Sequence, residues 1–294
     1  MDVRIDLLKC SADLLGESPV WDDASGCLHW VDSIAPRIRR FDFASGREDA
    51  WDMPLPVGSI GLCDRPGHLI AGLKDGFYGI DLAGGAANLM GAPAGLGAAC
   101  RLNDGKVDRQ GRFVCGALVP HGDPDPGGLY RIDRRGVVET LETGVRIANT
   151  LSFSPEGRTM YFADSLRRAV WAYDYEPESG AVSNRRVLID TAPLNSGTDG
   201  ACVDSAGCLW VALVETGRIV RITPRGDVDR TIELAVEFPS CPAFGGDGLA
   251  TLFVTSISDT GSGRMKGTRP ESGRVSVITG LGASGLPEPR FALG

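Results

Sequence analysis

The sequence lacks the features that would mark an exported, membrane-spanning or nucleic-acid-binding protein. No apolar run is long enough to span a bilayer, and the first residues are acidic and alternating, unlike a signal peptide. Lys and Arg (30) are outnumbered by Asp and Glu (38), and they form no dense basic stripe. These absences predict a soluble, cytoplasmic protein with neither nucleic acid nor membrane as a partner.

Histidine is scarce, and cysteine has no metal-binding spacing. The chain has 3 histidines, so a histidine-rich zinc site or a Ser-His-Asp triad is not expected. The 8 cysteines form no C-x-x-C pair, and several lie in apolar strand patterns, where a free cysteine behaves as a small hydrophobe. Without an export signal, reduced thiols in a cytosol are expected.

Glycine and proline, by contrast, are abundant, with 40 and 18 residues spread through the chain, as in proteins with many tight turns. Six turn glycines, each opening a short apolar strand pattern, recur about 40 to 50 residues apart, a period typical of propeller blades: Gly26, Gly67, Gly111, Gly157, Gly207 and Gly248. The six units fill residues 1–294. We therefore predict an all-β single domain, a six-bladed β-propeller, with a β-sandwich or a solenoid as the alternative.

A closed ring of blades needs a latch between its ends. We expect the N-terminal strand near residues 3–8 to pair within the last blade, beside the strand at 274–278. Three aspartates that follow the first strand of a unit, Asp22, Asp108 and Asp204, are expected on the turn side, where they bind backbone N–H groups.

Acidic and amide residues recur at one place in the repeat, eight or nine residues before the turn glycine: Glu17, Asn103, Asn149 and Asp199, with Ser59 and Ser240 in the remaining units. The first strand of a propeller blade lies along the central channel, so residues at a shared register converge on one axis. The pattern therefore predicts a polar ring with one metal site at the mouth of this channel. As an alternative, Asn103 and Asp199 each lie in an ordinary turn sequence.

Two carboxylates and two amide carbonyls form a set of hard oxygen donors. Such a set suits one divalent cation, Ca²⁺, Mg²⁺ or Mn²⁺, with Zn²⁺ or Fe²⁺ accommodated where water completes the shell.

At these residues the chain resembles the regucalcin, gluconolactonase and luciferin-regenerating enzyme family of six-bladed propellers. The matching segments are 15–22, 101–108 with 111–113, 148–157, 164–165 and 198–204, and the resemblance runs over nearly the full length. It implies that Glu17, Asn149 and Asp199 bind one divalent metal and that Asp199 is the general base. It also implies that Asn103 faces the metal across a substrate or water position and that Arg101 contacts substrate.

Two segments depart from the family pattern. The family usually has glycine after the residue matching Asn149, where this chain has Thr150. The loop at 121–126 matches no member whose substrate could be carried over. His121 in this loop remains a candidate substrate contact, with an ordinary exposed histidine as the alternative.

The resulting hypothesis is a divalent-metal-dependent hydrolase that opens a sugar lactone, an aldonolactone, to the aldonic acid in carbohydrate catabolism. The cation would polarise the lactone carbonyl or activate water, Asp199 would accept a proton, and Arg101 and Asn103 would hold the substrate. The alternatives are an esterase or phosphotriesterase of the same fold and a non-catalytic calcium-binding propeller. Nothing in the sequence requires more than a monomer or a weak oligomer.

Overall fold

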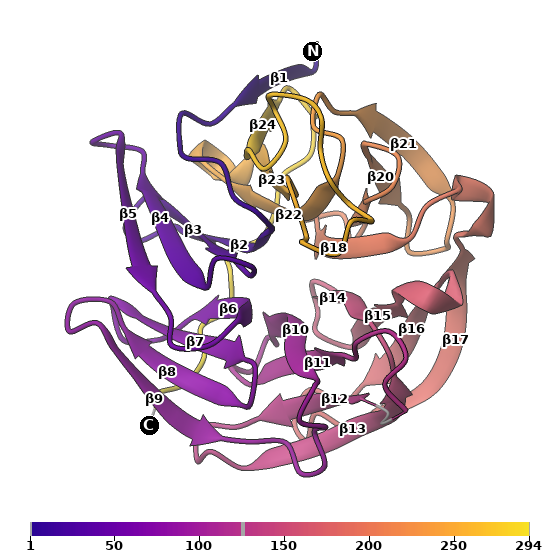
Figure 1. The fold of residues 1–294 in the computed structure, drawn as a ribbon. Helices are drawn as coiled ribbons and strands as arrows, with labels where there is room; N and C mark the ends of the chain where they lie inside the picture. Colours follow the sequence, from indigo (N-terminus) through magenta and orange to yellow (C-terminus); the bar gives the residue numbers. More distant parts are fainter. Residues whose placement is uncertain (1, 125–126, 294) are drawn as a thin grey trace.

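The computed structural model describes residues 2–124 and 127–293 and confirms the six-bladed β-propeller (Figure 1). Six four-stranded antiparallel sheets stand around a central axis, with the first strand of each blade innermost. Blade 1 consists of β2 (Gly16–Asp22), β3 (Cys27–Asp32), β4 (Arg37–Asp42) and β5 (Arg47–Asp52), and blade 2 of β6 (Val57–Leu62), β7 (His68–Leu73), β8 (Phe77–Asp81) and β9 (Ala86–Gly91).

Blades 3, 4 and 5 are likewise built from consecutive strands. Blade 3 contains β10 (Arg101–Val107), β11 (Phe113–Leu118), β12 (Gly127–Ile132) and β13 (Val138–Val145). Blade 4 contains β14 (Ala148–Phe153), β15 (Thr159–Asp164), β16 (Ala169–Tyr175) and β17 (Val182–Asp190). Blade 5 contains β18 (Thr198–Val203), β19 (Leu209–Leu213), β20 (Arg218–Ile222) and β21 (Val228–Glu233).

Blade 6 closes the ring with strands from both ends of the chain, β22 (Pro239–Gly245), β23 (Thr251–Ser256), β24 (Ser276–Thr279) and the N-terminal β1 (Arg4–Leu7). β1 pairs antiparallel with β24, with Ile5 opposite Ile278, which confirms the predicted latch. The inner strands contact one another around the ring, including β2 with β22.

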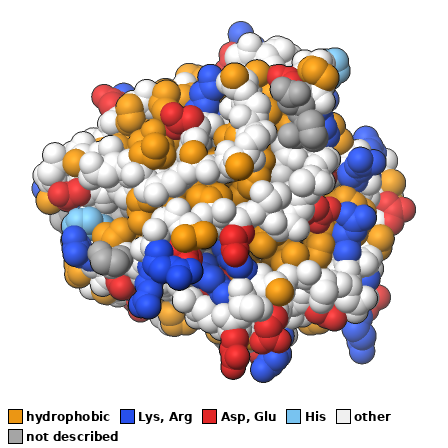
Figure 2. Space-filling view, turned by 90° about the horizontal axis from the view of Figure 1, so that it is seen from below, with side chains coloured by type: hydrophobic (Ala, Val, Ile, Leu, Met, Phe, Trp, Pro, Cys, Tyr) orange, Lys and Arg blue, Asp and Glu red, His pale blue; other side chains and the backbone are white. Residues whose placement is uncertain are grey.

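The helices in the described part of the chain are single 3₁₀ turns, η1 (Ser165–Arg167), η2 (Ala192–Leu194) and η3 (Asp247–Leu249). None is long and apolar enough to cross a membrane. The side of the molecule seen in Figure 2 carries charged side chains of both signs around hydrophobic ones. All eight cysteines are buried, as the apolar strand patterns around several of them predicted.

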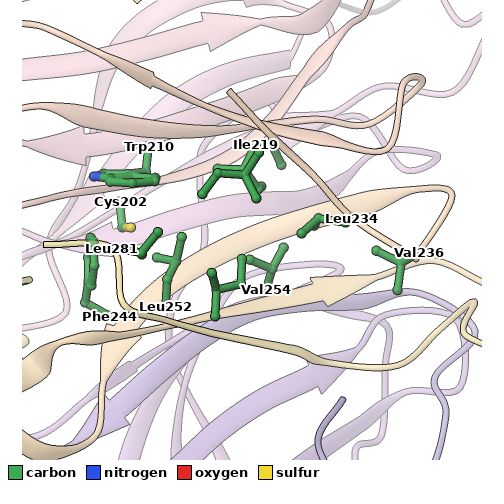
Figure 3. Packing of buried hydrophobic residues seen from close by; sticks show 12 residues of the cluster. Cys202, Trp210, Ile219, Leu234, Val236, Phe244, Leu252, Val254 and Leu281 are labelled. Atoms are coloured by element: carbon green, nitrogen blue, oxygen red, sulfur yellow. The ribbon is translucent and has the colours of Figure 1, made fainter. Parts of the chain in front are cut away.

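Hydrophobic side chains fill the space between neighbouring blades. Between blades 5 and 6, Cys202 and Trp210 lie against Phe244 and Leu252, and the Trp210 and Phe244 rings meet edge-on with centroids 5.7 Å apart (Figure 3). Each blade therefore buries its faces against its neighbours rather than against itself. The burial of apolar side chains is therefore complete only when the six blades close into a ring. This ring holds the inner strands around the axis.

The predicted turn-side aspartates do hold the turns. Asp108 Oδ1 accepts the backbone N–H groups of Gln110 and Arg112, each at 2.9 Å. Asp204 accepts the backbone N–H groups of Ala206 and Cys208 in the same way, and Asp22 accepts that of Ala24. These carboxylates lie at the end of the inner strand away from Glu17 and its counterparts, so they define the far face of the disc.

A C-terminal segment, residues 280–293, crosses this far face and passes behind blades 1 and 2 in Figure 1. Phe291 is fully buried there, and its backbone N–H donates to Leu62 O at 2.7 Å. Glu288 reaches the channel, where its Oε1 lies 3.9 Å from Lys106 Nζ. A cavity of about 40 Å³, lined by both residues and by Cys202, separates the segment from the inner strands. The C-terminal segment thus covers the end of the channel opposite the candidate site.

Candidate metal centre at the channel mouth

An irregularity of the β-bulge type interrupts the inner strand of every blade near its start. Glu17 and Asn149 are the last paired residues before a bulge, whereas Asn103 and Asp199 are the first residues inside one. The four residues share a register in the sequence, but the strand pairing separates them into two groups. Asn103 and Asp199 lie one position further along their inner strands than Glu17 and Asn149 do. Bulges bend a strand and change the direction of its side chains, so they decide which residues face the channel.

The residues that follow Glu17 and Asn149 have left-handed backbone conformations. The φ angle is 48° at Ser18 and 62° at Thr150. Such angles are rare for residues other than glycine, and for a β-branched residue they cost on the order of 1–3 kcal/mol. The departure from the family pattern at Thr150 thus falls on a backbone conformation that glycine adopts freely.

Hydrogen bonds orient the side-chain amide of Asn149. Its Nδ2 donates to Ser165 Oγ at 2.8 Å, and Ser165 Oγ donates to Thr198 O at 2.7 Å. Its Oδ1 accepts a bond from Asn103 Nδ2 at 3.1 Å. Because a carbonyl oxygen has two lone pairs, Asn149 Oδ1 keeps one for a cation. Ser165 belongs to the segment 164–165 used for the family resemblance, but the sequence alone gave it no role.

Three carboxyl groups interact electrostatically at the mouth of the channel, those of Glu17, Asp104 and Asp199. Burial is the largest cause that raises the pKa of each. The negative charge of Asp199, and then that of Asp104, raises the pKa of Glu17 further, and Asp104 does the same to Asp199. The Arg101 guanidinium opposes both shifts to a smaller extent. In the absence of a cation, the protein surroundings therefore favour the neutral, protonated form of these carboxyls more than water does.

This donor set fits a hard divalent cation, which would stabilise the ionised form of these carboxyls. Within residues 2–124 and 127–293, no group of three or more His, Cys, Asp or Glu side chains is arranged to hold a metal ion. A cation bound by Glu17 and Asp199 would accordingly take its third protein ligand from the amide oxygen of Asn149.

Asp104 is a feature of the site that the sequence reasoning missed. It lies in β10 with an exposed fraction of 6%, and its Oδ2 accepts the backbone N–H of Leu151 in β14 at 2.8 Å. The tripeptide Asn103-Asp104-Gly105 had the form of an ordinary turn. The tripeptide begins two residues after the start of the inner strand, and a turn at that point would interrupt this strand. That position is the signal that could have assigned Asp104 to the strand.

The candidate substrate residues lie on blade 3. Arg101 Nη1 donates to Leu102 O at 3.0 Å. Asn103 Nδ2 donates to Ala148 O at 2.9 Å as well as to Asn149, which leaves Asn103 Oδ1 as an acceptor. His121 is exposed. It lies at the same end of blade 3 as Arg101, because Leu118, three residues earlier in the chain, pairs with Arg101. Residues 125–126 of its loop lie outside the described residues.

Ser59 and Ser240 do not extend the polar ring as predicted. Both are fully buried. The Ser59 hydroxyl lies 3.3 Å from Cys115 Sγ, and the Ser240 hydroxyl donates to Gly16 O at 2.5 Å. These hydroxyls satisfy polar groups between blades, so the prediction that all six units contribute to the mouth was wrong for these two.

The fold and the site together define a six-bladed propeller with an oxygen-donor centre at one mouth of its channel. The sequence profile of the SMP-30/Gluconolactonase/LRE-like region matches residues 15–258, and the chain belongs to this family. Membership in this group supports a lactone-hydrolase type of function.

Individual relatives are similar over the whole length. The 6-deoxy-6-sulfogluconolactonase of Pseudomonas putida is 34% identical over 289 residues, which are 97% of this chain and 98% of the relative. Regucalcin of Gallus gallus is 33% identical over 297 residues, 99% of both chains. The crystal structure of the calcium-binding protein regucalcin from Agrobacterium tumefaciens has a TM-score of 0.89 at 25% identity, covering 97% of this chain and 96% of its own.

Proposed function

We propose that the protein is a divalent-metal-dependent sugar lactonase that opens an aldonolactone to the aldonic acid. The observation that carries the proposal is the arrangement of the half-buried Glu17 carboxyl and the buried Asp199 carboxyl, which interact electrostatically, with the oriented amide oxygen of Asn149. A relative named for lactonase activity, matched over 97% of this chain, supports the substrate class. The eight cysteines form no disulfide with one another, which supports a reducing, cytoplasmic location.

A bound divalent cation would act as a Lewis acid on the lactone carbonyl. Asp199 would accept the proton of the attacking water, although its coordination to the cation would oppose the rise in pKa that burial causes in the cation-free carboxyl. Arg101 uses Nη1 on a backbone carbonyl, so its remaining N–H groups would stabilise the developing negative charge on oxygen. Asn103 Oδ1 would accept a sugar hydroxyl and orient the ring.

The Asp199→Asn variant tests this assignment. We expect it to keep the wild-type circular dichroism spectrum and to lose about 10²- to 10⁴-fold in lactone turnover, because the amide cannot accept the proton. The control is Asp6→Asn, the same chemical change at an exposed residue of β1, which should leave turnover unchanged. Wild-type turnover by Asp199→Asn would refute the role of Asp199.

A substrate panel would separate this proposal from its alternatives. The panel would contain a pentonolactone, a hexonolactone, a 6-sulfo hexonolactone, an aryl ester and a phosphotriester, each assayed with added Ca²⁺, Mn²⁺ or Zn²⁺. The 6-sulfo lactone is included because of the name of the Pseudomonas putida relative. Preference for the aryl ester or phosphotriester would indicate the esterase. A protein that binds Ca²⁺ but hydrolyses nothing would be the non-catalytic propeller that the calcium-binding relative suggests.

A further inference from the structure

Ser18 and Thr150 share features that set them apart in the ring of inner strands. Ser18 directly follows Glu17, and Thr150 directly follows Asn149. Both are buried, with exposed fractions of 2% and 0%. They are also the only residues other than glycine in the described inner strands whose φ angle is positive. The remaining inner strands make their bulges without such a residue, so a bulge alone does not require one.

Both side-chain hydroxyls cross to the next inner strand. Ser18 Oγ accepts the N–H of Ile60 in β6 at 2.9 Å and also lies 3.3 Å from Ile60 O. Thr150 Oγ1 donates to the backbone carbonyl of Asp199 in β18 at 2.8 Å. Thr150 therefore follows one candidate ligand in sequence and holds the backbone of another.

A left-handed threonine is strained, and strain of this kind persists only where the surroundings hold the conformation in place. At Ser18 and Thr150 the hydroxyl bonds between blades supply that restraint. A left-handed residue at a bulge alters the course of the strand and thereby the direction of the preceding side chain. At both positions the preceding side chain is a candidate ligand.

We propose that Ser18 and Thr150 are a matched pair of positioning residues that hold the candidate ligands in place and thereby set the affinity for the cation. The proposal rests on the proposed function only in taking Glu17, Asn149 and Asp199 as ligands of one cation. Ligands that are held in position before binding lose less conformational entropy when the cation binds. Removing a hydroxyl should therefore weaken cation binding even where the protein still folds.

Substitutions at Thr150 separate the hydroxyl from the backbone strain. Thr150→Ser keeps the hydroxyl, Thr150→Val keeps the shape and the strain without it, and Thr150→Gly removes both. We expect Val and Gly to raise the Kd for Ca²⁺ about fivefold to tenfold and Ser to change it by less than about twofold. The Tm of the chelator-treated protein should fall less for Thr150→Gly than for Thr150→Val, because glycine relieves the left-handed strain.

Ser18 provides a parallel test, and Ser33 a control. Ser18→Ala should also raise the Kd for Ca²⁺ about fivefold. Ser33 is equally buried, and its Oγ donates to Val57 O in the next blade at 2.6 Å, but it follows no candidate ligand. Ser33→Ala should lower the Tm and leave the Kd for Ca²⁺ unchanged.

The deciding measurement is titration calorimetry with Ca²⁺ on the metal-free full chain, with Asp199→Ala as the variant that removes a ligand. The proposal is supported if Thr150→Val and Thr150→Gly bind Ca²⁺ weakly to a similar degree although their Tm values differ. It is overturned if both bind with wild-type affinity while Asp199→Ala does not bind, an outcome that leaves the proposed function intact. If the wild type itself binds no Ca²⁺, Mn²⁺ or Zn²⁺, both proposals fail together.

Discussion

Replacing Phe291 by alanine tests whether the C-terminal segment is part of the folded ring or only lies on it. The Phe291 side chain is fully buried in a cluster with residues of blades 2 and 3, including Phe77, Leu102 and Phe113. Truncating a buried phenylalanine to alanine costs about 3–5 kcal/mol, because burial energy is lost and a cavity remains. That is a large share of the 5–15 kcal/mol by which a typical protein is stable.

The assay is urea unfolding followed by tryptophan fluorescence. With an m value of about 3 kcal/mol per molar urea, we expect the midpoint of Phe291→Ala to fall by about 1–2 M. Leu293→Ala is the control, because Leu293 is only half-buried at the edge of the same cluster and should lose about 1 kcal/mol. A midpoint for Phe291→Ala within about 0.2 M of wild type would refute the view that this segment stabilises the ring.

Two further predictions concern two buried titratable groups, His29 in blade 1 and Asp13 just before it. Burial lowers the pKa of His29 from 6.5 to about 4, so the unfolded chain binds the proton first and stability should fall by up to about 3 kcal/mol as the pH drops from 6.5 towards 4. His29→Gln should flatten that part of a plot of urea midpoint against pH, and equal slopes in the two proteins would contradict the assignment. The Asp13 carboxylate forms an ion pair with Arg39 Nε at 2.5 Å and accepts a hydrogen bond from Trp30 Nε1 at 2.7 Å. In thermal unfolding, we expect Asp13→Ala to lose about 3–5 kcal/mol of stability. Asp13→Asn should lose less, because its amide oxygen can still accept the Trp30 bond. Equal losses in the two variants would exclude the Trp30 bond as a contributor to stability.

The repeat made the architecture accessible from the sequence alone. The period of the turn glycines predicted six blades, and the alternating N-terminus predicted a latch that β1 and β24 form. Aspartates such as Asp108 were also placed on the correct side, because a residue that follows a strand and precedes a turn glycine can reach the turn backbone.

The finer structure of the site depended on features that sequence spacing does not encode. Counting residues put Ser59 and Ser240 in one ring with Glu17, but the spacing cannot say which side chains the bulges direct towards the channel. Thr150 has a left-handed backbone conformation, and its hydroxyl donates to the backbone carbonyl of Asp199, which lies 49 residues away in the sequence. The C-terminal segment crosses the far face through contacts with several blades and has no repeat pattern of its own.

The central claim is that the oxygens of Glu17, Asn149 and Asp199 bind one divalent cation on which lactone hydrolysis depends. The most direct measurement is the rate of aldonolactone hydrolysis by chelator-treated protein as Ca²⁺, Mn²⁺ or Zn²⁺ is added back in steps. We predict negligible hydrolysis without cation and a rate that saturates, for at least one of these metals, at one equivalent per chain. Full hydrolysis in the presence of excess chelator would contradict the account.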